Sequence, residues 1–272
     1  MKIKSIIPKS TRGVIKKVIF YLSVFRLGIF KWIFLRDEKK YAYFQKRMFD
    51  YWARQSQYKH NDSRQDLVVG SYAAQNEWGD YDEYIMKYVD GSFRNKIALD
   101  FATGPGRNIT KYHDRFKRLD GVDISSVNIE NAKKNLIEHG ITLPNLYVNN
   151  GMDLEGIPSD TYDFVFSTIA MQHICVYNTR FNLLKEFYRV LKPGGRMSHQ
   201  MGYGVDSPNS VDYFVNDYAA LKTNGHRDTQ VKSPDLVKND LEKIGFKNFE
   251  YWIRPSGPGG KHKEWIYFTA VK

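Results

Sequence analysis

Residues 98–108 read ALDFATGPGRN, and an acidic residue, Asp123, stands nineteen positions after Gly104. The apolar residues of this stretch predict a buried β-strand over residues 97–101, which runs into a glycine turn and then a helix. Glycine at positions 104 and 106 lets a ligand approach the backbone closely and permits backbone angles that other residues avoid. The helix that follows would direct its free N–H groups and the positive end of its dipole at that ligand.

A second strand is predicted over residues 119–124, where Asp123 lies near the tip. In doubly wound α/β folds, an acidic residue at this place faces the glycine turn and holds the hydroxyls of a nucleoside ribose. The pattern therefore predicts a nucleoside cofactor. A dinucleotide is disfavoured, because the G-x-G-x-x-G fingerprint requires glycine where this chain has Ile109.

The motif D-x-A-x-G-x-G at residues 100–106 resembles motif I of the class I S-adenosylmethionine-dependent methyltransferases. Three further stretches resemble that family in the same order: residues 149–154 after a strand at 146–148, a strand at 162–167, and a helix at 183–191 closed by Lys-Pro-Gly-Gly at 192–195. Four ordered motifs are more specific than one glycine motif. The chain departs from the family at Ala102, where glycine is frequent, and at Asn150, where many members have an acid.

The resemblance implies an α/β fold with a doubly wound, seven-stranded, mostly parallel sheet and an antiparallel closing hairpin, plus an N-terminal helical arm. It also implies S-adenosylmethionine as cofactor and S-adenosylhomocysteine as product. The residues that it assigns to the cofactor are Asp100, Ala102, Thr103, Gly104, Gly106, Arg107, Asp123, Ile124, Asn150, Gly151, Met152, Thr168 and Gln172.

Several of these residues have an expected role. Asp123 would bind the ribose, and the amide oxygen of Asn150 would accept a hydrogen bond from the adenine amino group. Asp100 would support the cofactor's amino group or cap the glycine turn. Ile124 would lie against the adenine or in the core, and Arg107 would reach the cofactor carboxylate or only water.

His173 is the candidate catalytic base. Methyl transfer is an in-line displacement, so the protein mainly aligns the reacting atoms, and a base is needed when the acceptor is a hydroxyl or a protonated amine. His173 lies in the loop after the strand at 162–167, and histidine is the side chain that exchanges protons near neutral pH. Family members with a Gln-His pair in this loop act on small molecules or sugars. The alternative is that His173 caps or packs beneath the following helix.

The charge of the chain is unevenly distributed. Residues 1–60 carry 15 Lys or Arg against three acids, a net charge of +12, whereas the remaining residues carry 26 against 27. We therefore divide the chain into a basic arm, residues 1–60, and a methyltransferase domain, residues 61–272. A single cysteine, Cys175, excludes internal disulfides and predicts a cytoplasmic location. The seven scattered histidines predict no metal site.

Residues 14–35 of the arm predict an amphipathic helix, with apolar residues at alternating spacings of three and four along one face. For crossing a membrane, about twelve apolar residues gain roughly 0.3–0.6 kcal/mol each, and they are opposed by an off-centre lysine and by the central Arg26, which alone costs about 3 kcal/mol. The sum is near break-even and does not favour crossing. The helix is instead expected to lie on an anionic membrane surface, which would place the protein peripherally on the inner membrane face. The alternatives are packing on its own domain or a dimer seam.

The remaining segments include a helix over 39–59, a helix over 80–89, an insertion over 202–232, and a helix from Pro234 to Gly245 capped by Ser233. His226 and Asp228, in the insertion, are expected to be solvated, with substrate contact as the alternative. Together these features predict an enzyme that methylates a hydroxyl of a saccharide, a lipid-linked glycan or another small acceptor. An RNA methyltransferase that grips phosphates with the arm is the alternative. A cofactor-binding protein without catalysis ranks last.

Overall fold

The computed structural model describes residues 36–57, 78–204, 210–219, 227–256 and 262–272. The predictions for residues 14–35 and for His226 lie outside the described residues. Within the described ranges, no helix has the length and apolar character that a membrane crossing demands.

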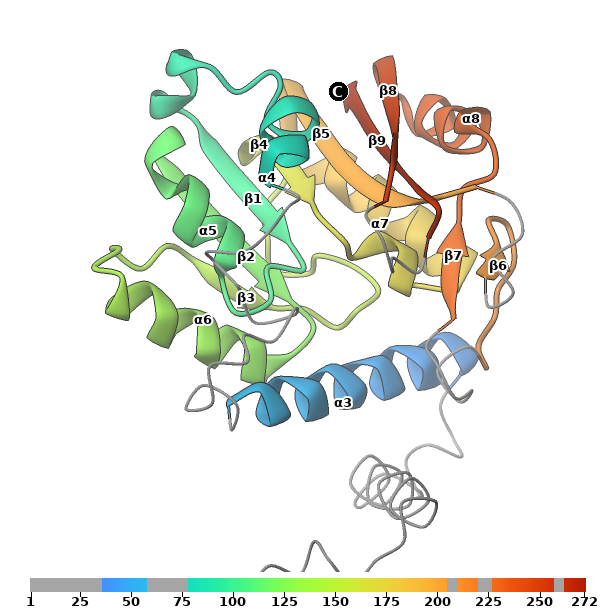
Figure 1. Ribbon diagram of the computed structural model, residues 1–272, viewed down its shortest axis with the longest axis horizontal. Helices are drawn as coiled ribbons and strands as arrows, with labels where there is room; N and C mark the ends of the chain where they lie inside the picture. Colours follow the sequence, from blue (N-terminus) through green and yellow to red (C-terminus); the bar gives the residue numbers. More distant parts are fainter. Residues whose placement is uncertain (1–35, 58–77, 205–209, 220–226, 257–261) are drawn as a thin grey trace, which may run out of the picture.

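The centre of the molecule is a seven-stranded sheet in the order β3-β2-β1-β4-β5-β9-β8 (Figure 1). Five strands pair in parallel: β1 (Ile97–Phe101), β2 (Arg118–Asp123), β3 (Leu146–Val148), β4 (Tyr162–Ser167) and β5 (Leu191–Tyr203). The last two strands, β8 (Lys247–Pro255) and β9 (Glu264–Val271), pair antiparallel and close the sheet. The predicted fold class is confirmed.

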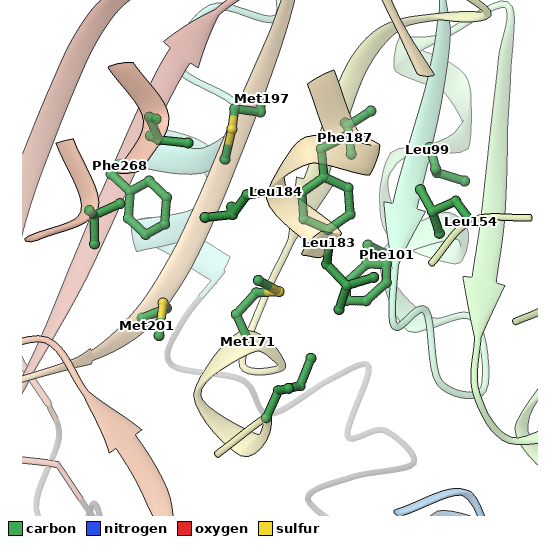
Figure 2. Packing of buried hydrophobic residues seen from close by; sticks show 14 of the residues in the cluster. Leu99, Phe101, Leu154, Met171, Leu183, Leu184, Phe187, Met197, Met201 and Phe268 are labelled. Atoms are coloured by element: carbon green, nitrogen blue, oxygen red, sulfur yellow. The ribbon is translucent and has the colours of Figure 1, made fainter. Parts of the chain in front are cut away.

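Helices cover both faces of the sheet, because successive residues of each strand point to opposite faces and both sets are apolar. Leu99 and Phe101 of β1 pack with α7 (Tyr177–Val190), β5 and β9 in one cluster, shown in Figure 2. Ala98 and Phe164 pack in a second cluster on the other face. The elements of that second face are α5 (Arg107–Tyr112), α6 (Ser126–Glu138) and the π-helical turn η2 (Tyr81–Ile85).

The remaining elements are short apart from two helices. They are α3 (Asp37–Gln57), α4 (Trp78–Asp80), η3 (Gly91–Asn95), η4 (His113–Arg115), η5 (Met171–His173), β6 (Ser210–Asp212), β7 (Asp228–Gln230) and α8 (Pro234–Ile244). The Ser233 side chain accepts from the backbone N–H of Asp235 at the start of α8, and Gly245 ends the helix in the left-handed conformation, as predicted.

Several predicted boundaries differ from the structure. Strand β2 begins and ends one residue before the expected 119–124, and α3 begins and ends two residues before the expected 39–59. The helix expected over 80–89 is the short α4 followed by η2, which ends at Ile85. The helix expected over 183–191 begins at Tyr177. The turn expected at 192–195 lies within β5, where the pairing with β4 shifts register, so that the glycines form an irregularity inside the strand instead of a separate turn.

Helix α3 crosses the edge of the sheet at which the parallel strands end (Figure 1). Tyr41, Phe44 and Met48 of this helix are buried in the same cluster as β1 and α7. This part of the predicted arm therefore packs into the core of the methyltransferase domain.

Candidate active site

The glycine turn follows β1 and has a strained, left-handed backbone. Gly104 and Gly106 have φ angles of 55° and 85°, and Gly106 is the residue from which α5 begins. The N–H of Gly104 donates to Oδ2 of Asp123 over 2.9 Å. Glycine adopts this backbone without the steric cost that other residues bear, which explains its presence there.

Asp123 ends β2 and is 6% exposed. Its Oδ1 accepts from the backbone N–H of Ser125 over 2.7 Å, and burial raises the pKa of its carboxyl group while the two backbone donors oppose this shift. Nδ2 of Asn128 also donates to Oδ1 over 3.4 Å. Each carboxylate oxygen has two lone pairs, so these three hydrogen bonds leave an acceptor site on Oδ2 for a ligand. Asp123 lies on the wall of the cavity described next.

A cavity of about 200 Å³ opens at this edge of the sheet. Its lining includes nine residues predicted from the sequence: Ala102, Thr103, Gly104, Arg107, Asp123, Ile124, Gly151, Thr168 and His173. It also includes residues that the sequence reasoning missed, among them Gln45, Phe49, Asn108, Asn128, Asn149 and Ile169. Five predicted residues are not part of the lining: Asp100, Gly106, Asn150, Met152 and Gln172.

Asn108 connects two of the predicted residues behind the cavity wall. Its Nδ2 donates to Oδ1 of Asp100 over 3.1 Å and to Oγ1 of Thr168 over 3.0 Å. Among the described residues, Oδ1 of Asn108 and Oδ2 of Asp100 are buried without a hydrogen-bond partner. Burial raises the pKa of Asp100 to about 7. These acceptors suit a ligand that carries a cationic donor.

The structure places Asn149, and not the predicted Asn150, in the lining of the cavity. The side chain of Asn150 is exposed, its Oδ1 accepts from the backbone N–H groups of Met152 and Asp153, and its Nδ2 donates to Asp153, so this amide closes a turn. Asn149 lines the cavity instead, beside Ile124 and Gly151. Oδ1 of Asn149 is buried and has no hydrogen-bond partner among the described residues.

His173 lies at the end of η5 and lines the cavity with a side chain that is 29% exposed. Its Nδ1 lies 2.7 Å from Oδ1 of Asp228 on β7, a residue that is 4% exposed. Asp228 was expected to be solvated and is instead buried against the histidine. A carboxylate at Nδ1 fixes the tautomer in which Nδ1 carries the proton, which leaves Nε2 as the acceptor.

Arg180 of α7 anchors the segment that carries Asp228. This buried guanidinium donates to the backbone carbonyl oxygens of Ile174 and Tyr213 and to Oγ1 of Thr229, the last over 2.8 Å. The loop of His173 and the strand of Asp228 are therefore held to the same helix, although 55 residues separate the pair in sequence.

Helix α3 is hydrogen-bonded to both sides of the cavity. Tyr41 Oη and Gln45 Nε2 donate to the backbone carbonyl oxygen of His173 over 3.2 and 3.3 Å. Lys46 Nζ donates to the carbonyl oxygen of Ile124 over 3.1 Å, and Ser125 Oγ donates to Asp50 Oδ1 over 2.6 Å. The helix thus connects the loop after β2 with the loop after β4.

The sequence offered few signals for the missed residues. Asn108 belongs to the first quoted stretch, but nothing there showed that its amide reaches back to β1. Gln45 and Phe49 are two residues in an aromatic-rich helix. Asp228 could be found only by knowing which part of the insertion returns to the loop of His173.

The comparisons with known proteins agree with this geometry. Residues 99–198 match a family described as "Methyltransferase domain". The chain is 26% identical over 188 residues to the S-adenosyl-L-methionine-dependent Diels-Alderase iliD of Neonectria sp. (strain DH2). The aligned region covers 64% of this chain and 67% of that protein. It is 26% identical over 226 residues to the demethylmenaquinone methyltransferase of Bacillus subtilis (strain 168), which covers 76% of this chain and 93% of that enzyme.

A solved structure of phosphoethanolamine N-methyltransferase 2 of Haemonchus contortus, in complex with S-adenosyl-L-methionine, superposes with a TM-score of 0.57 at 15% identity. The match covers 84% of this chain and 58% of that chain, so this chain spans little more than half of the nematode enzyme. At this identity the likeness shows the fold. The match over residues 99–198, from β1 to β5, identifies this part of the chain as a methyltransferase domain.

Proposed function

We propose that this chain transfers the methyl group of S-adenosylmethionine to a hydroxyl group of a small acceptor, with His173 as the general base. The observation that carries the proposal is the 2.7 Å contact between Nδ1 of His173 and Asp228, made on the wall of the cavity that the glycine turn and Asp123 also line. A base oriented by a buried carboxylate is the arrangement that proton abstraction from a hydroxyl requires.

The residues present fit the cofactor. The remaining acceptor site on Oδ2 of Asp123 would accept from a ribose hydroxyl, and the unpartnered Oδ1 of Asn149 would accept from the adenine amino group. Asp100 and Asn108 would receive the cationic amino group, since both retain a buried acceptor without a partner among the described residues. We therefore assign the adenine contact to Asn149 in place of Asn150.

When bound, S-adenosylmethionine supplies a methyl group on a positively charged sulfur. Nε2 of His173 accepts the proton of the acceptor hydroxyl as that oxygen becomes the nucleophile. The proton on Nδ1 stays between His173 and Asp228, whose carboxylate stabilises the imidazolium that forms. Helix α3 restricts the access of water to this side of the cavity through Gln45 and Phe49.

The acceptor that we propose is a saccharide, a lipid-linked glycan or another small hydroxyl compound. The name of the Bacillus subtilis relative adds demethylmenaquinone to the compounds worth testing. An RNA acceptor is disfavoured, because Arg107 is the only Lys or Arg among the described residues that line the cavity, and phosphate binding draws on several such residues. Contact of residues 14–35 with an anionic membrane surface stays part of the proposal.

The test is incubation of the purified full chain with methyl-labelled S-adenosylmethionine and fractionated cell extract. Label is followed into lipid-glycan, small-molecule and RNA fractions for the wild type, for His173→Ala and for His113→Ala, an exposed histidine that serves as the control. We expect label in a small-molecule or lipid-glycan fraction that is lost only in His173→Ala. Label that enters RNA would overturn the proposal.

A further inference from the structure

Asp228 lies between two histidines. Its Oδ1 is 2.7 Å from Nδ1 of His173, and its Oδ2 is 3.3 Å from Nε2 of His262. His262 lies two residues before the start of β9. His262 is 3% exposed and does not line the cavity, whereas His173 does. The imidazole of His173 therefore lines the cavity, whereas the imidazole of His262 is connected to the cavity only through the carboxylate of Asp228.

The fold provides a close-fitting place for the ring of His262. A Cβ atom built on Gly202 of β5 would lie 2.3 Å from Cε1 and Nδ1 of this ring, so no other residue type fits at position 202 while the ring stays in place. The φ angle of Gly202 is not in the left-handed region, which means that the backbone alone does not demand glycine there. The indole of Trp265 packs against the ring with centroids 5.0 Å apart.

Burying an imidazole has a cost when its nitrogens lack hydrogen bonds. Among the described residues, both ring nitrogens of His262 are buried without a hydrogen-bond partner, and Asp228 is the charged group that the ring faces. An aromatic residue would fill the same space at lower cost. Packing alone therefore does not explain an imidazole at this place, whereas its contact with Asp228 does.

We propose that His262 is a positioning residue that holds the carboxylate of Asp228 in the orientation from which it binds His173. A proton on Nε2 of His262 attracts Oδ2 of Asp228, which fixes the plane of the carboxylate and directs Oδ1 at Nδ1 of His173. His173 then keeps its proton on Nδ1, and its Nε2 remains an acceptor. The inference rests on the proposed function of His173.

The experiment is nitrogen-15 NMR of the full chain labelled at histidine, which reports the tautomer of the His173 ring without any acceptor. The His173 signals are identified by their loss in His173→Ala. We expect the Nδ1–H tautomer in the wild type, a clear loss of its population in His262→Phe, and its recovery in His262→Gln, whose amide nitrogen replaces Nε2. Gly202→Ala should reproduce the loss, because the added carbon displaces the ring.

Two readouts complete the test. The affinity for S-adenosylhomocysteine, measured by calorimetry, should stay within about twofold of the wild type in His262→Phe, while the turnover of labelled S-adenosylmethionine into the acceptor fraction falls about tenfold. A wild-type tautomer in folded His262→Phe would overturn the inference, as would equal effects of His262→Phe and His262→Gln. If either variant does not fold, Gly202→Ala and the remaining variant decide. Full turnover in His173→Ala would instead contradict the proposed function, in which His173 is the general base.

Discussion

The two halves of the cavity are built in different ways. The half that we propose for the cofactor consists of the glycine turn, Asp123 and Asn149, and its central contact, from Gly104 to Asp123, spans 19 residues within one strand–helix–strand unit. The half that we propose for the acceptor consists of His173 in the cavity lining and of Asp228 and His262 outside it, and these residues come from three separate segments. The first half is formed by local chain geometry, so it is readable from sequence. The second exists only once distant segments have packed, so it is free to differ between proteins that share the fold.

The largest effect should come from the acceptor half. His173→Ala should lower methyl transfer by about 10²–10⁴-fold, because it removes the proton acceptor. Binding of S-adenosylhomocysteine should be unchanged, and His113→Ala should match the wild type in both assays. If His173→Ala lost S-adenosylhomocysteine binding together with methyl transfer, the residue would serve both halves of the cavity, and this comparison would fail.

The cofactor half should respond in the opposite way. Asp123→Ala should weaken S-adenosylhomocysteine binding by about 1.5–3 kcal/mol, roughly 10–150-fold, since a charged acceptor for the ribose is lost. Calorimetry measures the affinity, and thermal unfolding separates this effect from a loss of the glycine turn. Asp114→Ala, at an exposed position, is the matched control. An unchanged affinity in folded Asp123→Ala would exclude the ribose contact.

Two adjacent asparagines sharpen the description of the cofactor half. Asn149→Ala should weaken S-adenosylhomocysteine binding by about 1 kcal/mol, roughly fivefold, through loss of one neutral hydrogen bond. Asn150→Ala should leave the affinity unchanged, because its amide closes an exposed turn. The reverse result in calorimetry would return the adenine contact to Asn150.

The smallest effect concerns pH. Burial raises the pKa of Asp100 to about 7, so the carboxyl group is largely protonated in the free protein below that pH and must ionise to pair with a cationic amino group. Affinity for S-adenosylhomocysteine should therefore rise a few-fold between pH 6 and pH 8 in calorimetry, and Asp100→Asn should flatten this rise. A wild-type profile in that variant would remove Asp100 from cofactor binding.

The same group affects folding stability in a defined direction. The unfolded chain releases the Asp100 proton near the ordinary carboxyl range, whereas the folded chain keeps it up to about pH 7. The free energy of unfolding should therefore contain a contribution that falls as pH rises from about 4 to 7. Urea unfolding across this range should show a smaller decline for Asp100→Asn than for the wild type.

Much of the fold was predictable for a physical reason. Strands β1, β3 and β4 have the predicted bounds because each is a short apolar run between polar or glycine-containing segments. The glycine turn was found because its backbone needs particular residue types. Asn149 could not be distinguished from Asn150, since the two residues follow β3 directly and the sequence does not show which of them faces the cavity.

The partners of His173 were beyond sequence reasoning for a different reason. Asp228 lies in a loop-rich insertion without periodicity, and no local rule links it to a residue 55 positions earlier. His262 follows a glycine-rich sequence at residues 257–260, and no motif there links the histidine to Asp228. Such contacts depend on the path of the whole chain, which short-range propensities do not encode.

The attachment of α3 to backbone atoms has a consequence for evolution. Tyr41, Gln45 and Lys46 bind the carbonyl oxygens of His173 and Ile124, which every residue type provides. The side chains at these two loop positions can thus mutate while the helix remains fastened over the cavity. A lineage with this architecture is able to exchange these residues, and with them the chemistry that the cavity supports, without first losing the contacts of α3.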